Sequence, residues 1–437
     1  MARRLQAGDS LHQFMTPHIA LVHTRPSLGV GTGTVTRPAA QVRRDRIGLY
    51  VALLLAYPFF EYGRPENPMR IPMLCSCILF GAWLWLPNKK WHPQLGYFFA
   101  LVVVMCTGIL MAMNTPSAVW HTYGLLVTLV GTCIPLMAFV NSVRRITAFV
   151  HALLAAFLYV ALYAITHNGV GPGWQDENYA ATAMSMALPF AYFSIFITRR
   201  TIVRVLYATL AGAFMVAVVV SFSRGGFLGL GAALIYCWMR SPRGWPAYLI
   251  PSALVLTLVV AATPAYWTEM QSITDMREAT IQYRFDLWQI AYRMFEDYPL
   301  TGVGPGNFVW NAGDYQSAEQ FERYRRSLAA SSVTHSLYFE LLAELGLAGF
   351  SIFLAMLYRN WKDLRFVARV THDGAGEMQR LACYERAIAG SFVGVLVSGA
   401  SVSLLYYSHV WLLTAMAVAL KEITKRRRSA DLCPAKA

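Results

Sequence analysis

The segment YRFDLWQIAYRMFEDYPLTGVGPGNF (283–308) differs in character from most of the sequence around it. It belongs to a polar insert, residues 264–335, that carries tryptophan and arginine and separates two apolar regions. Apolar stretches of the length that crosses a lipid bilayer make up nearly all of those regions. Membrane helices are usually joined by short loops, so we expect functional residues in this long insert.

The composition predicts a membrane protein. Of the 437 residues, 56% are hydrophobic and 14% are charged, and the mean hydropathy is +0.42. The apolar residues fall in blocks of about 17–25, which is the length of one helical crossing of the hydrocarbon core. We therefore predict an all-α, polytopic membrane protein with about 12 transmembrane helices and one large periplasmic loop that contains amphipathic helices.

The predicted organisation has five parts. Residues 1–43 are expected to be a disordered cytoplasmic tail and 421–437 a basic cytoplasmic tail. Residues 44–263 hold the first nine spans, 264–335 the periplasmic catalytic loop, and 336–420 the last three spans. The predicted spans are 47–62, 71–87, 95–114, 119–140, 146–166, 179–198, 202–222, 225–239, 246–263, 336–357, 387–404 and 407–420.

We attribute the net charge of +14 to the topology of a membrane protein rather than to the binding of nucleic acid. Arginines and lysines concentrate in alternate connections, including the segment 359–386, and near the two ends of the chain. Cytoplasmic loops of membrane proteins carry such an excess, so we place the N-terminus in the cytoplasm and the insert outside. We predict no nucleic acid among the partners.

Two arginines are candidates for binding a phosphate. Arg224 follows SFS at the outer end of a predicted span, where a charge is costly unless it is paired or faces an aqueous cavity. Its neighbours Gly225 and Gly226 would permit a tight reversal and close backbone approach. Arg284 lies on a predicted amphipathic helix, 281–297. A guanidinium can bind a phosphate through two hydrogen bonds and keeps its charge. The alternatives are an interface anchor for Arg224 and a solvated side chain for Arg284.

The aromatic residues of that predicted helix recur every three to four positions, which is the spacing of one helical face. We expect the helix to lie along the membrane surface with these rings at headgroup level. The four residues are Phe285, Trp288, Tyr292 and Phe295.

His335 is the sharpest candidate for proton transfer, because an imidazole titrates near neutral pH. It stands where the insert enters the tenth predicted span, and a purely structural role is the alternative. Glu340 and Glu344 follow on the same predicted helix, about 7 and 13 Å deeper at a rise of 1.5 Å per residue. They are either functional carboxylates or ties between helices.

Weaker candidates for substrate contacts lie nearby. Asn307 follows the glycines of TGVGPGNF, whose spacing fits no standard phosphate loop and favours a rigid turn. Arg323, Arg325 and Arg326 are expected to form a solvated face. The remaining candidates are Arg293 and Trp288 in the insert, and Asp176, Glu177 and Asn178, which also fit an ordinary helix cap.

No metal and no cofactor are predicted. The insert contains no compact acidic motif of the kind that metal-dependent sugar transferases use. None of the seven cysteines falls in the insert, so no zinc site or disulfide framework is indicated.

Three motifs together resemble the O-antigen ligase and polymerase family of bacterial envelopes. They are SFSRGG (221–226), the insert segment quoted above, and HSLYFELLAELGLAGF (335–350). The segment GWQDENYAATAMSMALPFAYF (173–193) also resembles a loop of that family. The likeness extends over about 170–350.

The resemblance implies a membrane glycosyltransferase of the bacterial inner membrane whose active site faces the periplasm. Members of this family transfer a glycan from undecaprenyl diphosphate to an acceptor hydroxyl. Arg224 and Arg284 would match the two phosphate-binding arginines of the family, and His335 its essential histidine. An inverting reaction without a metal would then use the arginines to stabilise the diphosphate and His335 as the base.

Three functions remain open. The preferred one is a ligase that transfers O-antigen to lipid A–core, because the single large insert and the run from His335 look more ligase-like. The second is a polymerase that joins lipid-linked O-antigen or exopolysaccharide repeats. The third is a non-catalytic lipid or solute transporter, although transporters tend to show paired broken helices in related halves. The expected partners are the lipid-linked donor, the lipid A–core acceptor and membrane lipids.

Overall fold

The computed structural model describes residues 39–63, 71–87, 89–173, 176–242, 252, 255–256, 259–260, 262–271, 279–325, 327–328, 332–372 and 374–432. The chain divides into two compact units, 1–44 and 45–437. Most of the predicted tail 1–43 and most of the predicted ninth span, 246–263, lie outside the described residues.

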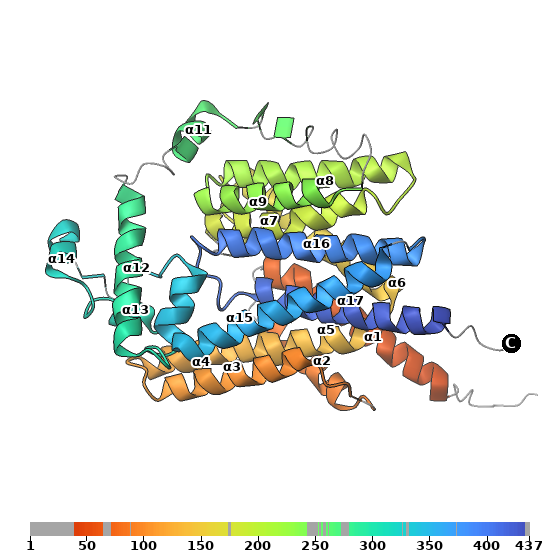
Figure 1. The fold of residues 1–437 in the computed structure, drawn as a ribbon, viewed down its shortest axis with the longest axis horizontal. Helices are drawn as coiled ribbons and strands as arrows, with labels where there is room; N and C mark the ends of the chain where they lie inside the picture. Colours follow the sequence, from red (N-terminus) through yellow and green to blue (C-terminus); the bar gives the residue numbers. More distant parts are fainter. Residues whose placement is uncertain are drawn as a thin grey trace, which may run out of the picture. The chain divides into compact units, whose positions relative to one another are not determined.

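Helices are the regular elements of the described chain (Figure 1). Those that precede the insert are α1 (Ala39–Gly63), α2 (Ile71–Leu84), α3 (Pro93–Ile109), α4 (Thr115–Leu126), the π-helix η1 (Val127–Cys133), α5 (Ile134–Phe139), α6 (Val143–Thr166), α7 (Glu177–Ser194), α8 (Thr201–Val220) and α9 (Arg224–Arg240). The insert contributes α11 (Pro264–Gln271), α12 (Ala279–Asp297), α13 (Phe308–Asn311) and α14 (Ala318–Tyr324). The last three are α15 (Leu337–Thr371), α16 (Glu377–Ser398) and α17 (Ser408–Leu432).

The polytopic, all-α prediction is supported by the lengths and hydropathies of these helices. Each predicted span other than 246–263 overlaps a helix. Among the described residues, 5 helices are long and apolar enough to cross a membrane: Thr115–Phe139, Val143–Thr166, Thr201–Val220, Leu337–Thr371 and Glu377–Ser398. The count of twelve spans and the side on which the insert lies stay predictions.

The region 359–386 is mostly helix rather than the connecting segment we expected. α15 continues to Thr371 and α16 already begins at Glu377, so the connection is short. Hydropathy marks only the apolar part of a helix, and a helix can extend beyond that part into water with charged side chains exposed.

The middle of the bundle is built on α7 and α16. Every residue of α7 from Ala180 to Ser194 is buried, and α16 packs against α7, α9, α15 and α17. Small side chains allow this density: a Cβ on Gly226 of α9 would lie 2.3 Å from the Cβ of Ala181. The predicted close approach at SFSRGG is therefore confirmed. The reversal itself uses Phe222, whose φ is 52°, rather than the glycines.

Helix α15 is broken at Gly346, where φ is 61° and ψ is −163°. The break frees backbone groups, and the turn after α12 satisfies them: Val303 N donates to Ala343 O (2.8 Å) and Leu347 N donates to Pro299 O (2.8 Å). The insert is thus hydrogen-bonded to α15 at the break in this helix. Glu340 and Glu344 precede this break, so their depths of about 7 and 13 Å along the helix stay predictions.

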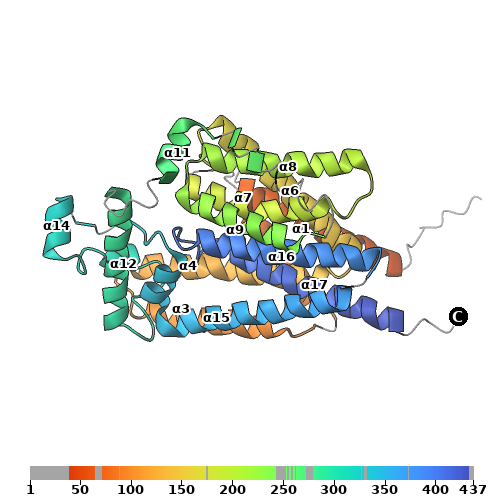
Figure 2. The same ribbon diagram turned by 45° about the horizontal axis from the view of Figure 1, so that its top comes forward.

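Helix α12 is amphipathic, as predicted, but its buried face is mainly aliphatic. Leu287, Ile290 and Met294 are fully buried in a small core with Phe308 of α13. Phe285 and Tyr292 of the aromatic stripe are exposed, as they would be on a membrane surface. Figures 1 and 2 show α12 crossing one end of the helix bundle rather than running along it.

Several segments predicted to be cytoplasmic meet at the other end of the bundle. Lys90, between α2 and α3, pairs with Glu422 of α17 (3.1 Å). Arg427 pairs with Glu377 at the start of α16 (2.5 Å). The segments around Lys90, Glu377 and 422–427 therefore lie together, and the side of the membrane that they face stays a prediction.

Candidate active site

A cavity of about 310 Å³ opens where α7, α8, α9, α11 and α12 come together. The first turns of α7, α9 and α12 all contribute to it, and helix N-termini favour anions. Two of the predicted arginines and two residues of the predicted α7 cap lie in its wall. The lining residues are Asn168, Glu177, Asn178, Ser221, Phe222, Ser223, Arg224, Glu269, Thr280 and Arg284.

Arg224 is the first residue of α9, a position where a positive charge is unfavourable for the helix itself. Its Nε and Nη2 both donate to Glu269 Oε1, at 3.0 and 2.6 Å. The Arg224 side chain is 12% exposed and that of Glu269 is 43% exposed. The guanidinium is therefore held by a carboxylate that water can reach and that an anionic ligand could replace.

Helix α11 carries Glu269 to this position by packing on the turn before α9. Tyr266 is fully buried, and its ring contacts those of Phe222 and Phe227 at centroid distances of 5.7 and 6.1 Å. The insert is thus attached to the bundle beside Arg224 as well as at Gly346.

The predicted cap of α7 is present and also borders the cavity. Asp176 Oδ1 accepts hydrogen bonds from the backbone N–H groups of Asn178 and Tyr179, each at 3.0 Å. Asn178 Oδ1 accepts a hydrogen bond from Ser223 Oγ (2.8 Å). Asp176 therefore acts as a cap, whereas Glu177 and Asn178 face the cavity.

His335 is held on both sides by neighbouring segments. The indole Nε1 of Trp288 donates to the carbonyl of Thr334 (3.0 Å), and Leu337 N donates to Gly399 O (2.8 Å). His335 itself has φ 48°, a left-handed conformation that costs a non-glycine residue roughly 1–2 kcal/mol. These contacts hold the backbone on both sides of His335 and offset that strain.

The imidazole of His335 is electrostatically linked to the cavity. Burial and the neighbouring Arg284 guanidinium lower the pKa of His335 to about 4, and Glu177 opposes the shift. Arg284 and Glu177 both line the cavity. His335 is therefore neutral at pH 7, the form that can accept a proton.

Backbone strain concentrates around the same place. Among the described residues other than glycine, positive φ angles occur at Asn168 (54°), Phe222 (52°), Arg325 (51°) and His335 (48°). Two of these residues line the cavity, and His335 interacts with its wall. Strained backbone that the surrounding structure maintains is typical of functional sites.

Three predicted substrate contacts have structural partners instead. Asn307 is fully buried, and its amide accepts from the backbone N–H of Asn114 (2.7 Å) and donates to the C=O of Asn114 (3.2 Å). Glu340 is buried and accepts a hydrogen bond from Leu405 N (3.0 Å). Trp288 positions Thr334 and stacks on Phe339 at a centroid distance of 5.2 Å.

Glu344 ties segments together rather than lining the cavity. It accepts hydrogen bonds from the N–H groups of Gly306 (2.7 Å) and Phe308 (3.1 Å) and from the Tyr406 hydroxyl (2.5 Å). Gly306 has φ 61°. The TGVGPGNF segment is therefore the rigid turn that the sequence predicted.

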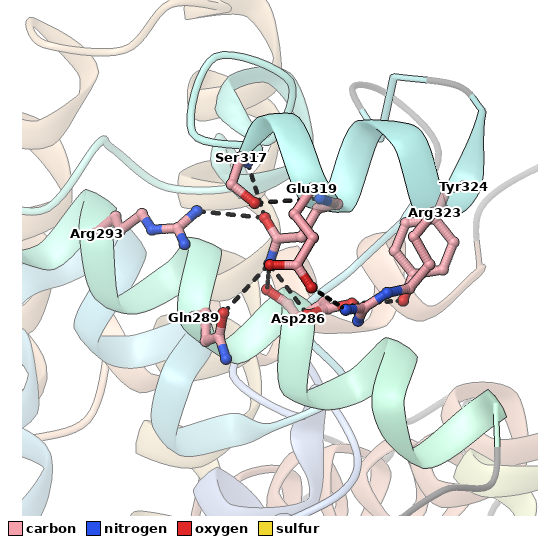
Figure 3. Close-up of polar contacts among 8 residues, drawn as sticks. Asp286, Gln289, Arg293, Ser317, Glu319, Arg323 and Tyr324 are labelled. Carbon is pink, nitrogen blue, oxygen red and sulfur yellow. Dashed lines mark hydrogen bonds and ion pairs between the residues drawn. The ribbon is translucent and has the colours of Figure 1, made fainter.

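Arg293 belongs to a polar network inside the insert, on the α14 side of α12 (Figure 3). Its Nη1 donates to Tyr315 O (2.8 Å) and Gln320 Oε1 (3.2 Å). At the centre, the buried Asp286 carboxylate accepts from Arg323 (2.7 Å) and Tyr324 (2.6 Å). Arg323 was expected to be solvated, but it fastens α14 to α12.

Glu269 and Asn168 border the cavity but were not singled out from the sequence. Nothing in the sequence around Glu269 predicts that it pairs with an arginine 45 residues earlier. Asn168 precedes a glycine, and this pair could have indicated a turn, although not its place beside Arg224. Among the described residues, no group of three or more His, Cys, Asp or Glu side chains could hold a metal ion.

The comparison with protein families bears on this segment of the chain. Residues 208–354 match the family model Wzy_C, described as O-antigen ligase. The matched range contains Arg224, Arg284 and His335, together with the whole insert. No curated protein matches the chain. Over residues 208–354, the chain is therefore similar to the O-antigen ligase family.

Proposed function

We propose that the protein is an O-antigen ligase: an inverting, metal-independent glycosyltransferase that moves a glycan from undecaprenyl diphosphate to a hydroxyl of lipid A–core. The reaction would take place at the periplasmic face of the inner membrane. The observation that supports the proposal is that Arg224 from α9 and Arg284 from α12 line one cavity. His335 lies near enough for two residues of the cavity wall, Arg284 and Glu177, to influence its pKa.

In the proposed reaction, the acceptor hydroxyl attacks the anomeric carbon of the donor sugar. The bond between that carbon and the diphosphate oxygen breaks, and undecaprenyl diphosphate leaves with the electron pair. His335 takes the hydroxyl proton, and the two guanidinium groups neutralise the charge that develops on the leaving group.

Glu269 would hold Arg224 in place before the donor binds. Its carboxylate accepts two hydrogen bonds from the guanidinium, at 2.6 and 3.0 Å. A phosphate oxygen would accept such bonds at similar distances. Because Glu269 is 43% exposed, it can turn into water when the diphosphate arrives. Donor binding would then exchange one anion for another.

The second candidate is a polymerase of lipid-linked repeats, since the family comparison supports both reactions. We would delete the gene and size the glycans separately on the lipid carrier and on lipopolysaccharide. A ligase predicts long chains retained on undecaprenyl diphosphate and bare lipid A–core. Single repeats on both carriers would instead identify a polymerase, and unchanged glycans would refute both.

A transfer assay with purified protein tests the chemistry directly. The substitutions Arg224→Gln and Arg284→Gln should each raise the donor KM, whereas His335→Gln should abolish turnover with little change in donor affinity. Activity should persist in EDTA. An active His335→Gln protein, or unaltered donor affinity in both arginine variants, would contradict the assigned roles.

A further inference from the structure

A second, larger cavity lies between α9, α15 and α16. It has a volume of about 500 Å³ and a mainly apolar wall. An adjoining cavity of about 340 Å³ shares Arg240, Ala368, Arg369 and Glu385 with it. The two form one groove, which we call the α15–α16 groove.

The groove changes from apolar to basic along its length. Leu357 of α15 and Leu396 of α16 mark the apolar part, while Arg369 and Glu385 mark the polar part. From Leu357 to Arg369 the helical rise is about 18 Å, similar to the ~15 Å hydrocarbon thickness of one leaflet. The shape and polarity fit one acyl chain with its headgroup.

The polar part carries an excess of positive charge. The two cavities are lined by four arginines, Arg240, Arg365, Arg369 and Arg386, and by one glutamate, Glu385. Glu385 is buried and pairs with Arg240 (3.7 Å). Arg365 and Arg369 form no ion pair with any residue that the structure describes, and Arg365 lies over the ring of Trp361 (4.6 Å). A phosphate would supply the missing negative charge.

We propose that the α15–α16 groove binds an anionic phospholipid of the leaflet opposite the candidate active site. Its headgroup phosphate would meet Arg365 and Arg369, and one acyl chain would lie along Leu357, Phe392 and Leu396. Basic pockets between membrane helices on the cytoplasmic side suit such headgroups. This lipid is distinct from the donor carrier, since Arg369 lies about 35 Å along α15 beyond Gly346, away from His335.

The test uses the purified full-length protein in a neutral detergent, with phosphatidylglycerol and phosphatidylcholine of the same acyl chains as probes. Tm is measured by tryptophan fluorescence against lipid concentration. Phosphatidylglycerol should raise Tm at concentrations at least tenfold lower than phosphatidylcholine. The variant Arg365→Gln/Arg369→Gln should lose that preference, because both side chains are exposed and their removal leaves the core intact.

The matched control is Lys362→Gln/Arg199→Gln, which removes two exposed charges outside the groove and should keep the preference. Leu396→Trp fills the apolar part without altering charge and should weaken binding of phosphatidylglycerol several-fold. Equal stabilisation by the two lipids, or an unchanged preference in the arginine variant, would refute the site. Competition by undecaprenyl phosphate at equal concentration would make it a carrier site instead.

Discussion

The indole N–H of Trp288 donates to the carbonyl oxygen of Thr334 at 3.0 Å, so α12 holds the residue immediately before His335. The same ring stacks on Phe339, two residues into α15. Trp288 therefore spans the bend at which His335 adopts its left-handed backbone. The position of His335, the proposed base, therefore depends on the packing of the insert.

Trp288→Phe should lower kcat by roughly tenfold with little change in donor KM. Phenylalanine keeps the ring contact but loses the N–H donor, and small displacements of a reacting group can cost up to ~100-fold in rate. Tyr292→Phe, on the exposed part of the same helix, is the control and should be fully active. A selective rise in KM for Trp288→Phe would point to substrate contact instead.

The pH profile of kcat/KM should show an acid limb near pH 4 rather than near 6.5. Burial and Arg284 keep the pKa of His335 low, so the imidazole stays neutral until the medium becomes strongly acidic. Arg284→Gln removes a positive neighbour and should move the limb to higher pH, whereas Glu177→Gln should move it lower. Shifts in the same direction would show that another group governs the profile.

Glu269→Gln should lower the donor KM, by up to about fivefold, because the pair with Arg224 is partly exposed and contributes at most ~1 kcal/mol. The diphosphate would then meet a guanidinium that no longer has an anionic partner in α11. Glu296→Gln removes an exposed carboxylate from α12 and serves as the control. If Glu269→Gln raised KM instead, Glu269 would be a support of the site and not a competitor.

Gly306→Ala should destabilise the protein by about 1–3 kcal/mol. The residue has φ 61°, and an added Cβ would lie 2.1 Å from His121 Nδ1, a ring that is held by the Ser117 carbonyl (2.9 Å). Thermal unfolding would measure the loss. Gly231→Ala is the comparison, because no neighbouring atom lies within 4 Å of its Cβ position. Equal Tm values for the two variants would show that the turn at Gly306 does not contribute to stability.

Asp286→Ala should release α14 from α12, at a cost of about 1–3 kcal/mol, because Arg323 and Tyr324 lose their shared acceptor. Limited proteolysis should then cleave within 313–325 faster than in the wild type. Glu319 is the other carboxylate that pairs with Arg323, and its side chain is 81% exposed. Glu319→Ala should therefore leave the cleavage rate nearly unchanged. Equal protection in both variants would show that the network does not hold α14.

Hydropathy and helical periodicity predicted where most helices lie, because both depend on residues close together in sequence. They also identified the insert, its amphipathic helix and the rigid turn around Gly306. They failed at the ends of α15 and α16, since a helix that leaves the membrane keeps its hydrogen bonds while its side chains become polar.

The sequence by itself determined an all-helical membrane chain with a large polar insert, and it supplied Arg224, Arg284 and His335 as candidates. Only the tertiary structure decided which side chains meet. Backbone groups are hydrogen-bonded by Asn307, Glu340 and Glu344. Arg293 donates hydrogen bonds within the insert, and Glu269 pairs with Arg224. The physical reason is that a buried polar group must find a partner, and the break at Gly346 together with the docking of α11 and α12 selects partners far apart in the chain.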